Sequence, residues 1–133
     1  MFYSDSNQLI YLVITTEVDE TNAYKIADLL LGEKLIPCIT FKNIESHFWW
    51  EGNINQSTEV QLMIKCKKDN LNNVCNKISE WHSYEVPEII FFRVSPYNCI
   101  YGEALFCQIM RPLLSIIRGF HTLQLNKLFF YHH

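Results

Sequence analysis

Two short stretches of this sequence are apolar at nearly every position, and they constrain the fold more than any other feature. Residues 9–16 read LIYLVITT, and residues 88–94 read EIIFFRV. Runs of this length, rich in β-branched and aromatic residues, are typical of strands that are buried on both faces. A chain with two such strands therefore needs a covering layer on each side of the sheet that they join.

Two amphipathic helices are expected between these strands. Asp19 is expected to cap the first helix, which Gly32 ends, and Asp69 is expected to cap the second. The apolar stripes at helical spacing consist of Ala23, Ile26, Ala27, Leu30 and Leu31 in the first helix, and of Leu71, Val74, Cys75, Ile78 and Trp81 in the second. Each helix thus has one face to bury against the sheet.

A long hairpin is expected between the two helices. Pro37 returns the chain to extended structure, and residues 38–51 are rich in β-branched and aromatic residues. A single strand of that length would span about 45 Å at ~3.3 Å per residue, so part of it must project beyond the domain body. Glu51-Gly52-Asn53 is the expected turn, and residues 58–66 are the expected return arm.

The resulting order is β-α-β-β-α-β, the ferredoxin-like arrangement of an α+β domain. This topology places both helices on one face of an antiparallel sheet and leaves the other face bare. Because both apolar strands belong to this sheet, the bare face cannot be very polar. An open apolar sheet face indicates a contact with another chain, and so does the overlong hairpin. The alternative is that the C-terminal segment of the chain folds back over the bare face.

The domain organisation follows from length and composition. The chain has 133 residues, enough for one domain, which we place at residues 9–96 after an N-terminal arm at 1–8. Residues 97–133 form a divergent C-terminal extension with three basic residues against one acidic residue, expected to be helical at first and then either disordered or packed on a neighbouring subunit. The net charge of −3 argues against a nucleic-acid partner.

Cysteine usage and the N-terminal sequence indicate a cytoplasmic protein. The five cysteines contain no CxxC pair, which argues against zinc-ribbon and thioredoxin-like sites and favours reduced thiols. The first residues lack the basic region and long apolar core of a secretion signal. The most apolar stretch, residues 104–120, is interrupted by charged residues and a proline, so no transmembrane segment is expected. The sequence also lacks the common nucleotide-binding and hydrolase motifs, and an enzyme is not expected.

Two sequence blocks resemble the CutA divalent-cation tolerance family. They are HFWWEG at residues 47–52, on the expected hairpin, and HSYEVPEI at residues 82–89, before the last strand. The resemblance extends over residues 9–94. It implies a homotrimer of ferredoxin-like protomers, similar in architecture to the PII signalling proteins. It also implies a role in tolerance of, or response to, divalent metals, copper above all, with no reaction firmly attached.

The resemblance also suggests candidate metal ligands. His82 follows a helix and a neutral imidazole suits copper, Cys38 matches a usual cysteine of the family, and Glu85 lies close to His82. The alternatives are a structural histidine and a buried thiol that acts as a small hydrophobe. Some bacterial relatives are proposed to bind copper through a cysteine and a histidine where this chain has Thr15 and Trp81.

A second candidate set consists of ligand-cleft or subunit-interface residues, namely Thr15, Trp50, Lys65, Tyr84 and Glu88. Lys65 on a largely buried strand needs a partner, because burying an unpaired charge is costly. That partner is either an acidic residue at an interface or an anionic ligand. Three functions therefore stay open: a trimeric metal-binding or metal-response protein, a non-catalytic assembly or anchoring module, and a PII-like sensor of a small anionic ligand.

Overall fold

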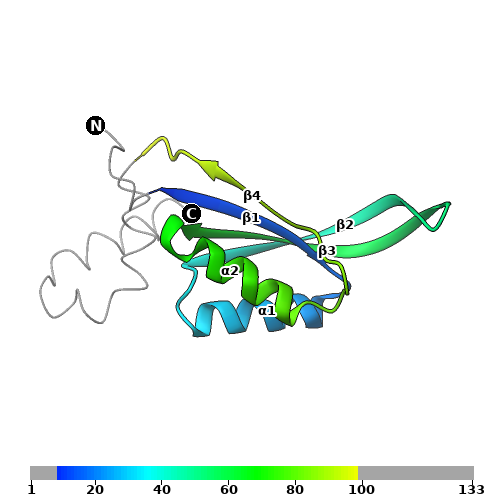
Figure 1. Ribbon diagram of the computed structural model, residues 1–133, viewed down its shortest axis with the longest axis horizontal. Coiled ribbons are helices and arrows are strands. Elements are labelled where there is room, and N and C mark those ends of the chain that lie inside the picture. Colours follow the sequence, from blue (N-terminus) through cyan, green and yellow to red (C-terminus); the bar gives the residue numbers. More distant parts are fainter. Residues whose placement is uncertain (1–8, 99–133) are drawn as a thin grey trace, which may run out of the picture.

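Four strands and two helices make up residues 9–98, the part of the chain that the computed structural model describes. In chain order they are β1 (Ile10–Glu17), α1 (Glu20–Gly32), β2 (Cys38–Trp50), β3 (Asn53–Lys67), α2 (Lys68–Trp81) and β4 (Ile89–Val94). The strands form one antiparallel sheet in the order β2-β3-β1-β4, and both helices cover the same face of it (Figure 1). The predicted α+β fold with its β-α-β-β-α-β order is confirmed.

The core lies between the helices and the inner face of the sheet. Along β3, buried residues alternate with partly exposed ones from Val60 to Cys66, as expected for a strand with one covered face. The fully buried apolar side chains include Val13, Ile26, Leu30, Leu62, Ile64, Val74 and Ile78. Burying each of these large aliphatic side chains contributes roughly 1.5–3 kcal/mol. The predicted apolar stripes of both helices therefore face the core, with the exception of Leu31, which is 41% exposed.

The two helices begin differently. The side chain of Asp19 accepts a hydrogen bond from the backbone N–H of Asn22 at 2.9 Å, which confirms the predicted cap of α1. Helix α2 instead begins at Lys68, whose backbone N–H donates to the carbonyl of Leu9 at 3.0 Å. The prediction that Asp69 caps α2 is therefore wrong, because a tertiary contact satisfies this end of the helix. Asp69 lies in the first turn, near the positive end of the helix dipole.

The β2–β3 hairpin is longer than the sequence analysis predicts. All 13 residues of β2 pair with β3, which begins at Asn53, so the predicted return arm of 58–66 is too short. Glu51 and Gly52 have φ angles of 50° and 79°, as in the tight two-residue turns that match the twist of paired strands. Strand β1 pairs with β3 only as far as Val60, and the hairpin projects beyond that point (Figure 1).

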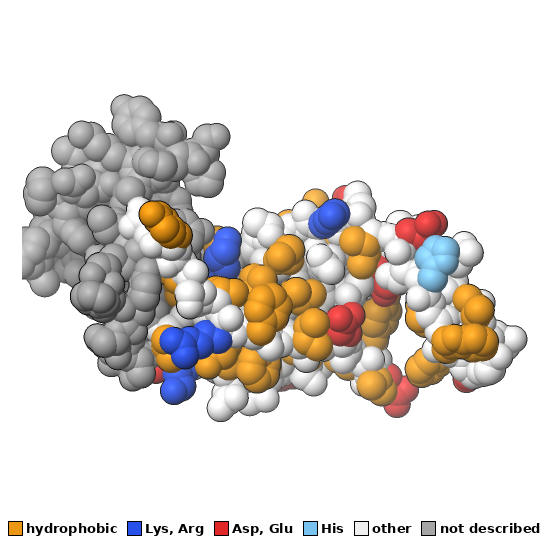
Figure 2. Space-filling model, turned by 90° about the horizontal axis from the view of Figure 1, so that it is seen from above, with side chains coloured by type: hydrophobic (Ala, Val, Ile, Leu, Met, Phe, Trp, Pro, Cys, Tyr) orange, Lys and Arg blue, Asp and Glu red, His pale blue; other side chains and the backbone are white. Residues whose placement is uncertain are grey.

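The face of the sheet opposite the helices carries an apolar patch over β1, β3 and β4. It carries Leu12, Ile14, Met63, Ile90 and Phe92, which we call the open face. Ile90 and Phe92 remain 46% and 47% exposed. Figure 2 shows apolar side chains gathered over this face and again on the hairpin. The predicted bare apolar face is therefore present within the described part of the chain.

The N-terminal arm at 1–8 and nearly all of the predicted extension at 97–133 lie outside the described residues. Their predicted boundaries and the predicted helix in the extension stay predictions. Between residues 9 and 98, neither helix is long and apolar enough to cross a membrane.

Candidate functional site

A buried carboxylate ends β1. The side chain of Glu17 is fully buried, and both of its oxygens accept hydrogen bonds. Oε1 accepts from the backbone N–H of Val18 at 2.8 Å and from the hydroxyl of Ser83, and Oε2 accepts from the backbone N–H of Ser83 at 2.9 Å. A charge is costly to bury unless donors satisfy it. These three donors offset the cost of burying the carboxylate of Glu17. They also connect β1 to the segment after α2.

The imidazole of His82 is also fully buried, and both of its ring nitrogens are bonded. Nδ1 accepts from the backbone N–H of Tyr84 at 3.0 Å. Nε2 lies 3.1 Å from the hydroxyl of Thr15, which donates its proton to the carbonyl of Glu88 at 2.6 Å. Because that hydroxyl has only one proton, Nε2 must be the donor. The hydrogen bonds therefore assign a neutral ring with its proton on Nε2.

The loop of residues 83–88 is tied to two strands by further side-chain bonds. Thr16 donates from its hydroxyl to Oε1 of Glu88 at 3.3 Å. The hydroxyl of Tyr84 donates to Oε2 of Glu59 on β3 at 2.5 Å. Burial and this hydrogen bond raise the pKa of Tyr84 above its ordinary value of 10.0, so the phenol stays a donor at neutral pH. The loop is thus fixed at the end of β1.

Thr15, His82 and Glu17 are connected in the order of a nucleophile, a base and an orienting acid. Nδ1 of His82 lies 3.5 Å from Oε2 of Glu17. A general base, however, needs a free lone pair on the nitrogen that faces the nucleophile, and here that nitrogen carries the proton. The side chain of Thr15 is also fully buried. This arrangement therefore acts as a structural network in the described conformation.

The comparisons with known proteins agree with this fold. Residues 11–103 match the family described as CutA1 divalent ion tolerance protein. The chain belongs to the CutA1 family. The divalent-cation tolerance protein CutA of Pyrococcus horikoshii is 36% identical to it over 87 residues, which are 65% of this chain and 85% of the relative. The protein of the same name from Yersinia pestis is 34% identical over 96 residues, or 68% and 81% of the two chains.

Solved CutA1 structures share the architecture. The crystal structure of CutA1 from Oryza sativa has a TM-score of 0.72 at 26% identity and covers 79% of this chain and 96% of its own. That of the CutA1 divalent ion tolerance protein from Ehrlichia chaffeensis has a TM-score of 0.70 at 32% identity, covering 75% and 94%. The membership that the HFWWEG and HSYEVPEI blocks predict is therefore confirmed.

The three candidate metal ligands of this CutA1 chain do not meet within one protomer. His82 bonds to Thr15 on the helix-covered face. Cys38 lies on the other face, where its sulfur is 3.9 Å from Nζ of Lys65, and Glu85 is exposed on the loop. Burial raises the pKa of Cys38, which disfavours the thiolate that metals bind. Among residues 9–98, no group of three or more His, Cys, Asp and Glu side chains is placed to hold a metal ion.

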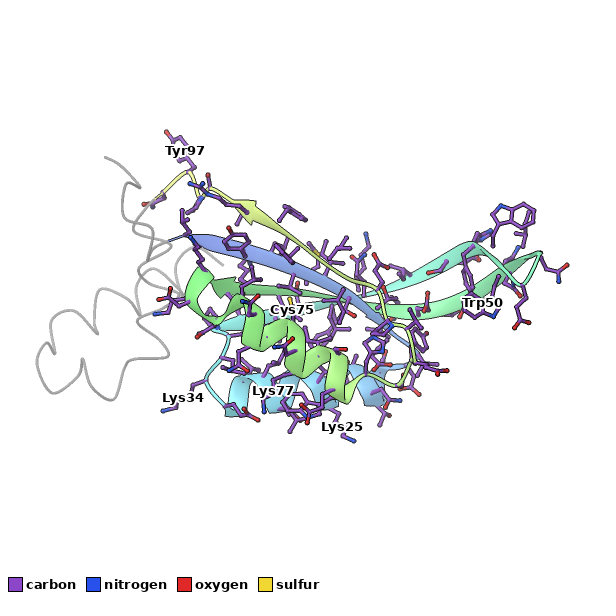
Figure 3. All side chains as sticks on the ribbon, viewed as in Figure 1. Lys25, Lys34, Trp50, Cys75, Lys77 and Tyr97 are labelled. Atoms are coloured by element: carbon purple, nitrogen blue, oxygen red, sulfur yellow. The ribbon has the colours of Figure 1, made fainter. Side chains whose placement is uncertain are left out.

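The candidate cleft residues occupy three separate places. Thr15, Tyr84 and Glu88 lie together in the network at the end of β1. Lys65 lies half-buried on the same face as Leu12. It is three residues along β3 from Leu62, which pairs with Thr15. Trp50 is 60% exposed near the end of the hairpin, far from the helices (Figure 3). One protomer therefore supplies parts of a cleft without closing it.

Glu17 is not among the predicted site residues, because the predicted first strand ends one residue before it. The signal lies in the period of the strand. Glu17 continues the set Tyr11, Val13 and Thr15, whose side chains face the helices. A carboxylate at that position has to be buried, and a buried carboxylate needs donors. Extending β1 by one residue would have identified it.

Removing the hydroxyl of Thr15 tests the network. Thr15→Val keeps the shape of the side chain but leaves Nε2–H of the buried His82 without its acceptor. We expect the free energy of unfolding to fall by about 1–3 kcal/mol, the usual cost of an unsatisfied buried donor. Urea unfolding measures this change. Thr58→Val on an exposed position of β3 is the matched control, and equal effects of the two substitutions would contradict the assignment.

Proposed function

We propose that this chain is a homotrimeric divalent-cation tolerance protein that acts by assembly and cation binding and does not catalyse a reaction. The names of its relatives support the cation role, since those from P. horikoshii and Y. pestis are called divalent-cation tolerance proteins. The exposed apolar open face is the observation that carries the proposal of assembly. The neutral, fully bonded ring of His82 supports a non-catalytic role for the network.

Two features of the protomer, the open face and the projecting hairpin, favour coverage of the open face by copies of the same chain. Its central side chains, Ile14 and Met63, lie opposite each other, and Ile90 and Phe92 extend the apolar surface to the edge strand β4. Covering such surface contributes roughly 25 cal/mol per Å². The hairpin projects away from its own domain and exposes Trp49 and Trp50 there. A hairpin of this kind reaches a neighbour more readily than its own core.

We further propose that a bound cation, copper or another divalent metal, takes its ligands from more than one subunit. The candidates His82, Cys38 and Glu85 are too dispersed within one protomer to form a common site. Cation binding should therefore depend on assembly. The three free cysteines of the described chain, Cys38, Cys66 and Cys75, support a reducing compartment, and we propose the cytoplasm.

Copper titration of the full-length protein tests this dependence. We expect the wild-type assembly to bind Cu²⁺. The variant Phe92→Glu, whose open face carries a charge, should lack at least one class of Cu²⁺ site. Calorimetry on both proteins at equal protomer concentration gives the comparison. The result that would sink the proposal is an identical binding isotherm for the assembled and the dissociated protein.

The second candidate is an assembly module that binds no cation of its own. It is favoured by His82, because both of its ring nitrogens are already bonded inside the protomer. Under this alternative the wild-type protein is a trimer, and the calorimeter records no saturable copper binding.

A further inference from the structure

The β2–β3 hairpin loses its third strand at one defined position. We call residues 44–46 and 57–60, around this position, the hairpin root. Glu17 at the end of β1 pairs with Val60 of β3, and the next residue outward, Glu59, pairs only with Ile44 of β2. From Glu59 to the turn, the hairpin is therefore two-stranded. Isolated two-stranded hairpins are marginally stable in water. A hairpin that projects this far needs support where the third strand ends.

The loop of residues 83–88 supplies a contact at this position. The hydroxyl of Tyr84 donates a hydrogen bond to Oε2 of Glu59 at 2.5 Å, which is a short bond to a carboxylate. Hydrogen bonds to charged groups are about twice as strong as neutral ones. The loop thus binds β3 at the first residue that β1 no longer accompanies.

Tyr84 is itself held from the side of β1. The backbone N–H of Ser83 and its hydroxyl both bind Glu17, and the backbone N–H of Tyr84 binds Nδ1 of His82. Two successive backbone donors are therefore fixed by buried acceptors. The contacts lead from Glu17 through Ser83 to Tyr84 and end at Glu59.

We propose that Glu17 is a positioning residue, whose buried carboxylate fixes the loop so that Tyr84 braces the hairpin root at Glu59. We call Glu17, Ser83, Tyr84 and Glu59 the brace. The brace lies within one protomer, so it goes beyond the proposed trimer and does not depend on it. Its consequence is that the direction and rigidity of the hairpin, with the exposed aromatic residues near its end, are set inside the domain. His82 belongs to the same structure and serves it as a fixed acceptor for Tyr84.

Hydrogen exchange of the full-length protein tests the brace. Tyr84→Phe removes only the hydroxyl that binds Glu59, and Glu17→Gln places an amide donor where Ser83 requires an acceptor. Each variant should speed exchange of backbone amides at the hairpin root, residues 44–46 and 57–60, by about tenfold, the effect of losing one bond to a charged group. The helices α1 and α2 should change much less.

Two control variants separate the brace from general destabilisation. Tyr24→Phe removes the hydroxyl of an exposed tyrosine on α1 and should leave exchange unchanged. Ile78→Val loosens the core and should speed exchange in helices and sheet together. If Tyr84→Phe speeds exchange in α1 and α2 as much as at the hairpin root, which is the pattern expected of Ile78→Val, the proposal is overturned.

The double variant gives the sharpest outcome. Because Glu17 and Tyr84 act through one series of contacts, the effects of Glu17→Gln and Tyr84→Phe on exchange at the hairpin root should not add. Additive effects would show two independent contacts and overturn the brace. The same differences are expected in a Phe92→Glu background, where open-face contacts between subunits are removed. Differences that vanish in that background would come from neighbouring subunits and would overturn the proposal while leaving the trimer intact.

Discussion

Replacing Glu17 with alanine is expected to lower the free energy of unfolding by about 3 kcal/mol or more. The substitution leaves the N–H and hydroxyl of Ser83 and the N–H of Val18 without their acceptor. An unsatisfied buried donor costs about 1–3 kcal/mol, and water offsets part of the sum of the three because Ser83 and Val18 are exposed. Urea unfolding followed by circular dichroism, at one fixed protein concentration, measures the change.

The matched control for this prediction is Glu80→Ala. Glu80 is exposed on α2, and exposed substitutions usually change stability by less than about 0.5 kcal/mol. Glu17→Gln should fall between the two, because it keeps one acceptor oxygen. A loss below about 1 kcal/mol for Glu17→Ala would contradict the assignment of Glu17 as a buried acceptor of three hydrogen bonds.

Phe92→Glu is expected to dissociate the proposed trimer. Phe92 lies on the open face, opposite Leu12 of β1, and a carboxylate at that position would have to be buried without a partner in each interface. The folded protomer should persist, because the side chain is already 47% exposed in the single chain. Light scattering gives the molar mass, and circular dichroism reports the fold.

Tyr24→Glu provides the control for Phe92→Glu. Tyr24 is also 47% exposed, but it lies on α1, on the helix-covered side of the molecule. Its replacement should leave the mass unchanged. If both variants keep the wild-type mass, the open face is not the interface. If both dissociate, the assembly is not specific to that face.

Much of the fold follows from local patterns in the sequence. The apolar runs that contain β1 and β4, the helical spacing in α1 and α2, and the turn at Glu51 and Gly52 are readable because each reflects a local physical preference. The start of α2 is not readable in this way. Its first backbone donor binds Leu9, a residue from the other end of the domain, and no local pattern indicates such a contact.

The candidate site was predicted in part. The HSYEVPEI block identifies the segment that crosses the end of β1, and Thr15, His82, Tyr84 and Glu88 do meet there. The chemistry of His82 was not predictable, because the tautomer depends on backbone atoms of a loop whose path the sequence does not specify. The proposed sharing of cation ligands between subunits was not predictable either, because no local pattern specifies which surfaces of separate chains meet.

The molar mass of the full-length protein in solution, measured by light scattering with and without added copper, tests the central claim most directly. We expect a molar mass of about three times the chain mass of 15.8 kDa in both conditions, because the open face is apolar with or without metal. A stable monomer in both conditions would contradict the account, since the open face would then have to be covered by the chain's own remaining residues.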